Sequence, residues 1–268
     1  MIGNEKGFRV FANFVLVLLT LSTVLPFILL LVSSITSEEA IMRYGYSFIP
    51  RDIDFAAYRY LLLSIKKILT AYMMTFIVTT VGTLLNVFMT IFMGYLLSKR
   101  DLPGRSFLSF FVFFTMLFSG GMIPSYLVWS QVIKVTDSIW GLILPNLLLS
   151  AFNVILVRTY FTTTIPPEII EAAELDSCSQ IGILFRIVVP LSKPMIATIS
   201  LFSALAYWND WINGLYYINT NKSLYTIQNM LNAMQNNLQF IKENAAAGMT
   251  EDAIQKMYDY DRQQFNAE

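Results

Sequence analysis

The residue types that carry most enzyme chemistry are scarce in this sequence. It contains no histidine, which excludes histidine acid–base catalysis, histidine metal ligands and any Ser-His-Asp triad. Cys178 is the single cysteine, so an internal disulfide framework is excluded too. There is no G-x-x-x-x-G-K-[ST] run to bind nucleotide phosphates. We therefore expect no catalytic residue, no metal site and no cofactor.

One candidate group is Trp208-Asn209-Asp210-Trp211, where an acid interrupts a long apolar stretch. A charged side chain at the centre of a membrane helix costs about 2.5 to 3.5 kcal/mol, so it normally faces protein or water. The indole rings offer flat stacking faces, and the amide of Asn209 offers hydrogen bonds. A position at the outer membrane interface explains the same residues, because aromatic belts are ordinary there. Nearby tyrosines fit that alternative: Tyr207, Tyr216 and Tyr217.

The second candidate is the connection over about 161–193. Pro166-Pro167 can open a helix, because the first turn needs no N–H there. Ile169, Ala172 and Ala173 follow at helical spacing and form a small apolar face. The helix should break over 176–179, where Asp and Ser residues favour caps and turns.

A second helix in this connection, over about 180–189, is expected to end before Pro190, and Pro194 then opens the next segment. The result is a helix–turn–helix that exposes alanines and Glu171. From these residues alone, an amphipathic linker at a membrane surface is the simpler interpretation.

Composition indicates that these groups belong to a membrane protein. Of the 268 residues, 56% are hydrophobic and only 13% are charged, whereas soluble domains average about 25% charged residues. The mean hydropathy is +0.57. These values exclude a disordered chain, and a soluble globule would expose large apolar patches. There are 18 basic and 18 acidic residues, so the chain has no net positive charge that would attract nucleic acid.

Five stretches approach the 20 or so apolar residues that a membrane-crossing helix needs: 14–35, 71–98, 106–129, 138–160 and 194–218. The first is longer than a signal-peptide core, which has about 7 to 15 residues, so we expect a retained helix. The third is interrupted by Gly120, Gly121 and Pro124. The predicted fold is an all-α polytopic transmembrane helix bundle.

Loop charges set the expected orientation, because basic residues favour the cytoplasmic side. We place three basic segments inside: one with Lys6 and Arg9, one with Lys99, Arg100 and Arg105, and one with Arg186 and Lys193. The connection with Lys134 and Asp137 goes outside. The loop at 36–70 holds five basic residues and four acids. We still place it outside, because the charges of the other loops favour that orientation.

This orientation gives a cytoplasmic N-terminus over 1–13, a first membrane helix at 14–35, an extracytoplasmic loop at 36–70 and a core at 71–218. A polar tail at 219–268 is expected outside, with an amphipathic helix over about 224–241.

The connection at 161–193 resembles the EAA loop of bacterial ABC-importer permeases. The matching positions are Glu171-Ala172-Ala173, then position 177, then Ile187, Val189 and Pro190. The longer run PPEIIEAAELDSCSQIGILFRIVVPLSKPMIAT is similar to the carbohydrate-uptake branch, of the maltose-permease type. MGYLLSKRDLPGR resembles the Ala-Tyr and Pro-Gly-Arg signature of the same branch. GGMIPSYLVW and the tryptophan pair in YWNDW resemble a subgroup that imports oligosaccharides from complex polysaccharides. The resemblance covers about residues 10–235.

Three features depart from the family pattern. Ser177 stands where the family has glycine, so we expect a remodelled turn or one capped by the serine hydroxyl. Cys178 replaces an alanine, as a passive substitute, and Val189 replaces a leucine. Relatives carry another membrane helix after the fifth, and no stretch after Ile218 reaches 20 apolar residues, so we expect a shortened permease.

The resemblance implies a type I ABC importer permease, a transport subunit rather than an enzyme. The coupling residues would be Glu171, Ala172, Ala173, Ser177, Ile187 and Pro190, which dock on separate ATPase subunits. The implied substrate path contains Trp208, Asn209, Asp210 and Trp211. A second homologous permease and an extracytoplasmic solute-binding protein complete the importer, in the lipid of a bacterial plasma membrane and without nucleic acid.

Three alternatives remain open. A secondary transporter usually shows paired internal repeats, which are not visible in this sequence. A permease for another small solute would share the loop signature. A membrane-embedded enzyme needs clustered polar residues, and the apolar stretches offer little beyond Asn86, Asn146, Asn153 and Asp210.

Overall fold

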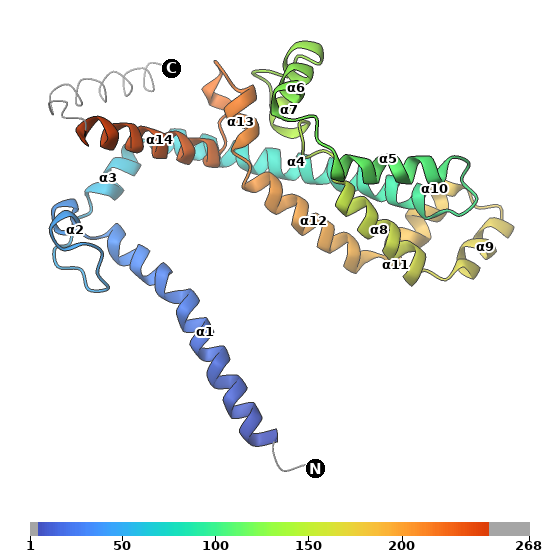
Figure 1. Ribbon diagram of the computed structural model, residues 1–268, viewed down its shortest axis with the longest axis horizontal. Coiled ribbons are helices and arrows are strands. Elements are labelled where there is room, and N and C mark those ends of the chain that lie inside the picture. Colours follow the sequence, from blue (N-terminus) through green and yellow to red (C-terminus); the bar gives the residue numbers. More distant parts are fainter. Residues whose placement is uncertain (1–4, 247–268) are drawn as a thin grey trace. The chain divides into compact units, whose positions relative to one another are not determined.

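The computed structural model describes residues 5–246, and within them every regular element is a helix (Figure 1). An isolated antiparallel bridge joins Thr36 and Ile53. The chain divides into two compact units, residues 1–67 and 68–268, which are described separately. The predicted all-α class is confirmed for the described residues.

The first unit is built on a long apolar helix, α1, which covers Glu5–Ser34. It is longer than the predicted span of 14–35, and its apolar side chains are exposed, as suits a lipid-facing helix. Two short helices follow, α2 at Glu38–Tyr44 and α3 at Ala56–Leu63. The hydroxyl of Ser37 caps α2 by accepting a hydrogen bond from the N–H of Ala40.

The second unit is organised around α4, which covers Ile65–Ser98. Two glycines let other helices approach it closely: α8 at Ala151–Thr164 and α12 at Lys193–Trp208. A Cβ added to Gly82 would lie 2.5 Å from the ring of Tyr207, and one added to Gly94 would lie 2.6 Å from Val157. Small residues at crossings are the usual means of bringing membrane helices together.

The predicted third span is bent rather than straight. It consists of α5 at Arg105–Leu117, α6 at Met122–Leu127 and a π turn at Val128–Val132, with a bend of 115° between the two parts. Gly121, with φ of +87°, lies at the break, so the glycines noted in the sequence separate the two parts.

The predicted fourth span is interrupted as well. A short helix, α7 at Ile139–Ile143, ends before Pro145, and α8 begins only at Ala151. Asn146 adopts a left-handed φ of +62° within the break. Proline has no N–H to continue the helix, so a single helix over 138–160 does not form.

Side chains from three other elements satisfy the backbone of this interruption. The Tyr207 hydroxyl of α12 donates to the Ile143 carbonyl at 3.0 Å, and Asn213, on α13 at Ile212–Tyr217, donates to the Pro145 carbonyl at 2.9 Å. Asn86 of α4 donates to the carbonyl of Leu147 at 2.7 Å. Irregular backbone at membrane depth requires such partners.

The number of membrane crossings therefore differs from the prediction. In the described residues two helices, α1 and α4, are long and apolar enough to cross by themselves, and up to four spans result if each bent pair counts as one. The second bent pair joins Gln180–Leu191 to Lys193–Trp208 at 86°. Five spans are not confirmed, because breaks shorten the helices that the apolar stretches predict.

The polar tail contains the expected amphipathic helix, α14, at Ile227–Ala246, after a short 3-10 turn at Lys222–Leu224. Its apolar side packs on α4 through Ile227 and Met230, which contact Ala71. The N–H of Ile227 donates to the hydroxyl of Thr75 at 2.9 Å. The rest of the predicted tail, 247–268, lies outside the described residues.

Asp137 holds the connection before α7 to the segment that follows α13. Its carboxylate accepts the backbone N–H groups of Asn219, Thr220 and Asn221 at 2.8 to 3.1 Å, and also the Thr220 hydroxyl. These hydrogen bonds favour the ionised form and lower the pKa of Asp137 to about 2. The carboxylate is therefore charged at any physiological pH.

Candidate functional site

The first helix of the 161–193 connection forms where its prolines predict it. It is α9, at Pro167–Leu175, with Pro166 as the N-cap residue and Glu168 in the first turn. The proline at the first position needs no hydrogen-bond donor, and the acid favours the positive end of the helix dipole.

A Schellman turn ends α9. The N–H of Cys178 donates to the Ala173 carbonyl and that of Ser177 donates to the Glu174 carbonyl, both at 3.0 Å. Ser177 adopts a left-handed φ of +58°. The turn therefore keeps a left-handed backbone with serine at a position that suits glycine, without the remodelling that the sequence suggested. Left-handed backbone costs a non-glycine residue about 1 to 2 kcal/mol.

Replacing Ser177 with glycine is expected to stabilise the protein. The left-handed cost disappears, while glycine loses more backbone entropy on folding, so the net gain is about 0.5 to 1 kcal/mol. Thermal unfolding of the purified protein measures it. Ser177→Ala is the matched control, because it keeps the Cβ and should remain close to the parent. Equal stability of the glycine and alanine variants would contradict the assignment.

The second helix runs further than the sequence predicts. It consists of α10 at Gln180–Ile183, a π turn at Leu184–Val188 and α11 at Val189–Leu191. The prediction that it ends before Pro190 is wrong. The wider π turn accommodates the proline, which lacks an N–H and crowds the preceding turn of a regular α-helix. Pro190 is exposed and Ile187 is half-buried.

The three residues of the EAA signature occupy different environments. Ala173 is buried in an apolar cluster with Ile91 and Tyr95 of α4 and Val157 of α8. Glu171 and Ala172 are exposed on the other side of α9. Leu175 is 86% exposed at the end of the helix. The loop is thus anchored to the bundle through one face and presents a carboxylate and apolar side chains on the other.

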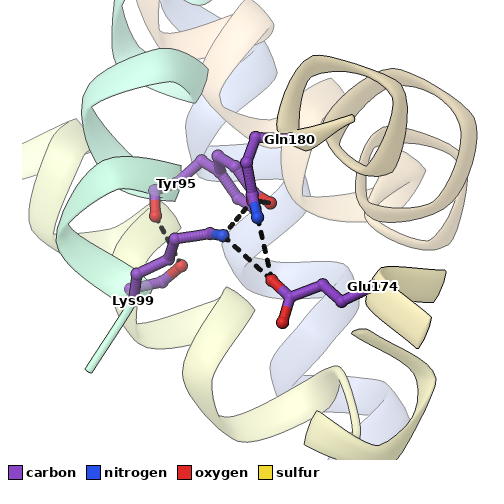
Figure 2. A network of polar contacts seen from close by, with 5 residues as sticks. Tyr95, Lys99, Glu174 and Gln180 are labelled. Atoms are coloured by element: carbon purple, nitrogen blue, oxygen red, sulfur yellow. Dashed lines mark hydrogen bonds and ion pairs between the residues drawn. The ribbon is translucent and has the colours of Figure 1, made fainter. Parts of the chain in front are cut away.

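A polar network ties this loop to the C-terminal end of α4 (Figure 2). Lys99 contacts both Glu174, at 3.3 Å, and the side-chain oxygen of Gln180. The Gln180 amide donates to Glu174 at 2.9 Å, and the Tyr95 hydroxyl lies 3.0 Å from Gln180. No local pattern in the sequence marks this network, because the residues on α9 and α10 lie 75 to 85 positions from their partners at the end of α4.

The residues predicted for a substrate path meet at the break between α12 and α13. Asn209 donates to the carbonyl of Leu205 at 2.9 Å and thereby closes the end of α12. Asp210 accepts the N–H of Ile212 at 3.1 Å and so caps α13. Trp208 and Trp211 are 38% and 39% exposed. Helix capping accounts for the acid in this apolar stretch.

Together, the apolar helix bundle and the loop anchored to it define the class of polytopic membrane proteins. The chain belongs to the family of binding-protein-dependent transport system inner membrane components, whose pattern matches residues 89–249.

Two relatives from Bacillus subtilis (strain 168) show the likeness along most of the chain. The polygalacturonan/rhamnogalacturonan transport system permease protein YtcP is 43% identical over 204 residues, which cover 76% of this chain and 70% of YtcP. Protein LplC is 40% identical over 197 residues, covering 74% of this chain and 65% of LplC. The chain thus spans about two thirds of the length of these relatives.

A solved structure shares the fold. The structure is a bacterial ABC transporter involved in the import of the acidic polysaccharide alginate, matched with a TM-score of 0.72 and 30% identity. The match covers 84% of this chain and 79% of the other chain. YtcP is thus named for polysaccharide transport and the solved structure belongs to a polysaccharide importer, in line with the resemblance noted in the sequence.

Proposed function

We propose that this chain is the transmembrane permease subunit of an ATP-binding-cassette importer that moves an oligosaccharide into a bacterial cell. The observation that carries the proposal is α9, which is anchored to α4 and α8 through Ala173 and exposes Glu171 and Ala172. An element with this arrangement can receive a push from a partner on one face and pass it to membrane helices on the other.

In this account separate ATPase subunits bind the exposed face of α9 from the cytoplasm. Glu171 meets a basic side chain or a backbone donor there, and Ala172 permits close approach. Nucleotide-driven closure of the ATPases displaces α9, and the buried Ala173 carries that displacement to the bundle. A second homologous permease and an extracytoplasmic solute-binding protein complete the importer in the plasma membrane.

Co-purification tests the proposed assembly. The tagged chain, expressed with its neighbouring genes and extracted in mild detergent, should retain an ATPase subunit and a second permease. An ATPase that remains bound when Glu171, Ala172 and Leu175 are all replaced by lysine would contradict this docking face.

We further propose that the N-terminus is cytoplasmic and that the segment after α13 is extracytoplasmic. The lone cysteine provides a built-in marker, because Cys178 is exposed in the coupling turn. A membrane-impermeant thiol reagent should label Cys178 only after lysis, and should label Asn221→Cys, made in a Cys178→Ala background, in intact cells. The opposite pattern would mean an inverted topology.

We also assign Trp208 and Asn209 to the substrate path, with Asp210 and Trp211 beside them. A sugar presents flat apolar faces and rings of hydroxyl groups, which suit exposed indole rings and an amide. Labelling of Asn209→Cys in the Cys178→Ala background should change when substrate or nucleotide is added. Asn221→Cys is the control and should label equally in all conditions. If labelling of Asn209→Cys is the same with and without substrate and nucleotide, position 209 does not belong to the path.

A further inference from the structure

A polar cluster joins α4 to both sides of the coupling turn, and we call it the α4 clasp. Its members are Tyr95 and Lys99 at the C-terminal end of α4, Glu174 in the last turn of α9 and Gln180 in the first turn of α10 (Figure 2). Tyr95 and Lys99 lie four positions apart, so they share one face of the helix end. Glu174 and Gln180 flank the Schellman turn, so the clasp contacts α9 before the turn and α10 after it.

The hydrogen bonds of the clasp fit only one arrangement of its polar atoms. Lys99 is a pure donor and the Glu174 carboxylate is a pure acceptor. Gln180 must therefore turn its oxygen toward Lys99 and its nitrogen toward Glu174, as the structure has it. The Tyr95 hydroxyl donates to the same Gln180 oxygen at 3.0 Å. Every member contacts at least one other element, so the arrangement fixes α9 and α10 relative to α4.

The clasp borders the apolar contact that anchors the loop. Tyr95 packs in the cluster that also contains Ala173 of α9 and Ile183 of α10, and its hydroxyl extends into the clasp. Apolar contacts resist separation but allow sliding, because they have no direction. Hydrogen bonds are directional, so the clasp adds the resistance to sliding that the apolar contact lacks.

Stability alone does not explain this cluster. The side chains of Lys99 and Glu174 are 24% and 44% exposed, and exposed ion pairs contribute little to folding. Hydrogen bonds from Gln180 and Lys99 hold the pKa of Glu174 below its ordinary value. The carboxylate is therefore charged at physiological pH, and its bonds weaken only as the pH falls below the ordinary range through this lowered pKa.

We propose that Tyr95, Lys99, Glu174 and Gln180 are positioning residues that carry a displacement of α9 directly to α4. This inference rests on the proposed function, since it presumes that an ATPase moves α9. Without the clasp, motion of α9 would reach the bundle only through the apolar contact and the chain connections to α8 and α12. Part of that motion would be lost because α9 would slide along α4 instead of moving it. The ATPase would then still bind and hydrolyse ATP, but less of the work would reach the substrate path.

The test is the number of ATP molecules hydrolysed for each sugar imported by the complete complex in proteoliposomes. Lys99→Gln and Glu174→Gln should each raise this ratio about tenfold, as expected for residues that carry coupling between sites. The reversed pair, Lys99→Glu with Glu174→Lys, restores opposite charges and should recover most of the coupling. Arg100→Gln is the matched control, because Arg100 is the next cation along the chain and lies outside the clasp; it should leave the ratio unchanged.

A merely structural role predicts a different result, namely less assembled complex with an unchanged ratio, and that outcome overturns the inference. If a charge variant does not assemble, Tyr95→Phe decides, because it keeps the ring in the apolar cluster and removes only the hydroxyl. An unchanged ratio in that variant also overturns the inference. A wild-type complex that neither binds an ATPase nor imports sugar would instead contradict the proposed function itself.

Discussion

Leucine in place of Gly82 is expected to remove the folded protein from the membrane. Even a single Cβ at this position would lie 2.5 Å from the ring of Tyr207, which is 1% exposed and can move aside only by disrupting the packing around it. The displaced tyrosine would also release the Ile143 carbonyl, whose bond spans 3.0 Å. Overpacking and an unsatisfied buried carbonyl together cost about 3 kcal/mol or more, a large part of the roughly 5 to 15 kcal/mol that stabilises a protein.

Yield and thermal stability of the detergent-extracted protein measure this effect. Gly120→Leu is the matched control, because a Cβ at Gly120 meets nothing within 4 Å, and it should fold normally. Tyr207→Phe separates the two causes, since it removes only the hydroxyl and should cost about 1 kcal/mol. A Gly82→Leu protein as stable as the control would contradict the close contact between α4 and α12.

Reversing the charge of Glu171 to lysine should abolish sugar uptake while capture by the solute-binding protein stays intact. The carboxylate is exposed on α9 and makes no hydrogen bond or ion pair with other described residues, so folding does not require it. In the assembled importer a lysine would face whatever donor normally meets the carboxylate, and unlike charges would become like charges.

Uptake by intact cells and substrate-stimulated ATP hydrolysis by the purified complex are the two readouts. Asp101→Lys makes the same charge change at another exposed site on the predicted cytoplasmic side and should transport normally. Full uptake and full stimulation in the Glu171→Lys complex would remove Glu171 from the coupling role.

Local signals in the sequence predict the helices of the 161–193 connection well. Pro167 opens α9, Ser177 and its neighbours end it, and Pro194 lies in the first turn of α12. Each signal acts through its own backbone, so no knowledge of distant residues is needed. The exception is Pro190, where a π turn absorbs the proline within a continuing helix. Such turns depend on how the flanking helix packs, and no residue type marks them.

The breaks within the apolar stretches are harder to predict, because partners far along the chain stabilise them. The interruption after Ile143 is satisfied by Asn86, Tyr207 and Asn213, which lie 61 to 68 residues from the carbonyls they cap. Hydropathy alone predicts an unbroken apolar helix over 138–160. In the sequence the same side chains are isolated polar residues, and only the fold shows that they serve the backbone. The α4 clasp is missed for the same reason.

The most direct test of the central claim is sugar accumulation in proteoliposomes that contain the full complex and its solute-binding protein. We predict that an oligosaccharide enters only when ATP is present on the side of the loop marked by Cys178, and that Glu171→Lys stops entry. Accumulation driven by a proton or sodium gradient without ATP would contradict the account and indicate a secondary transporter.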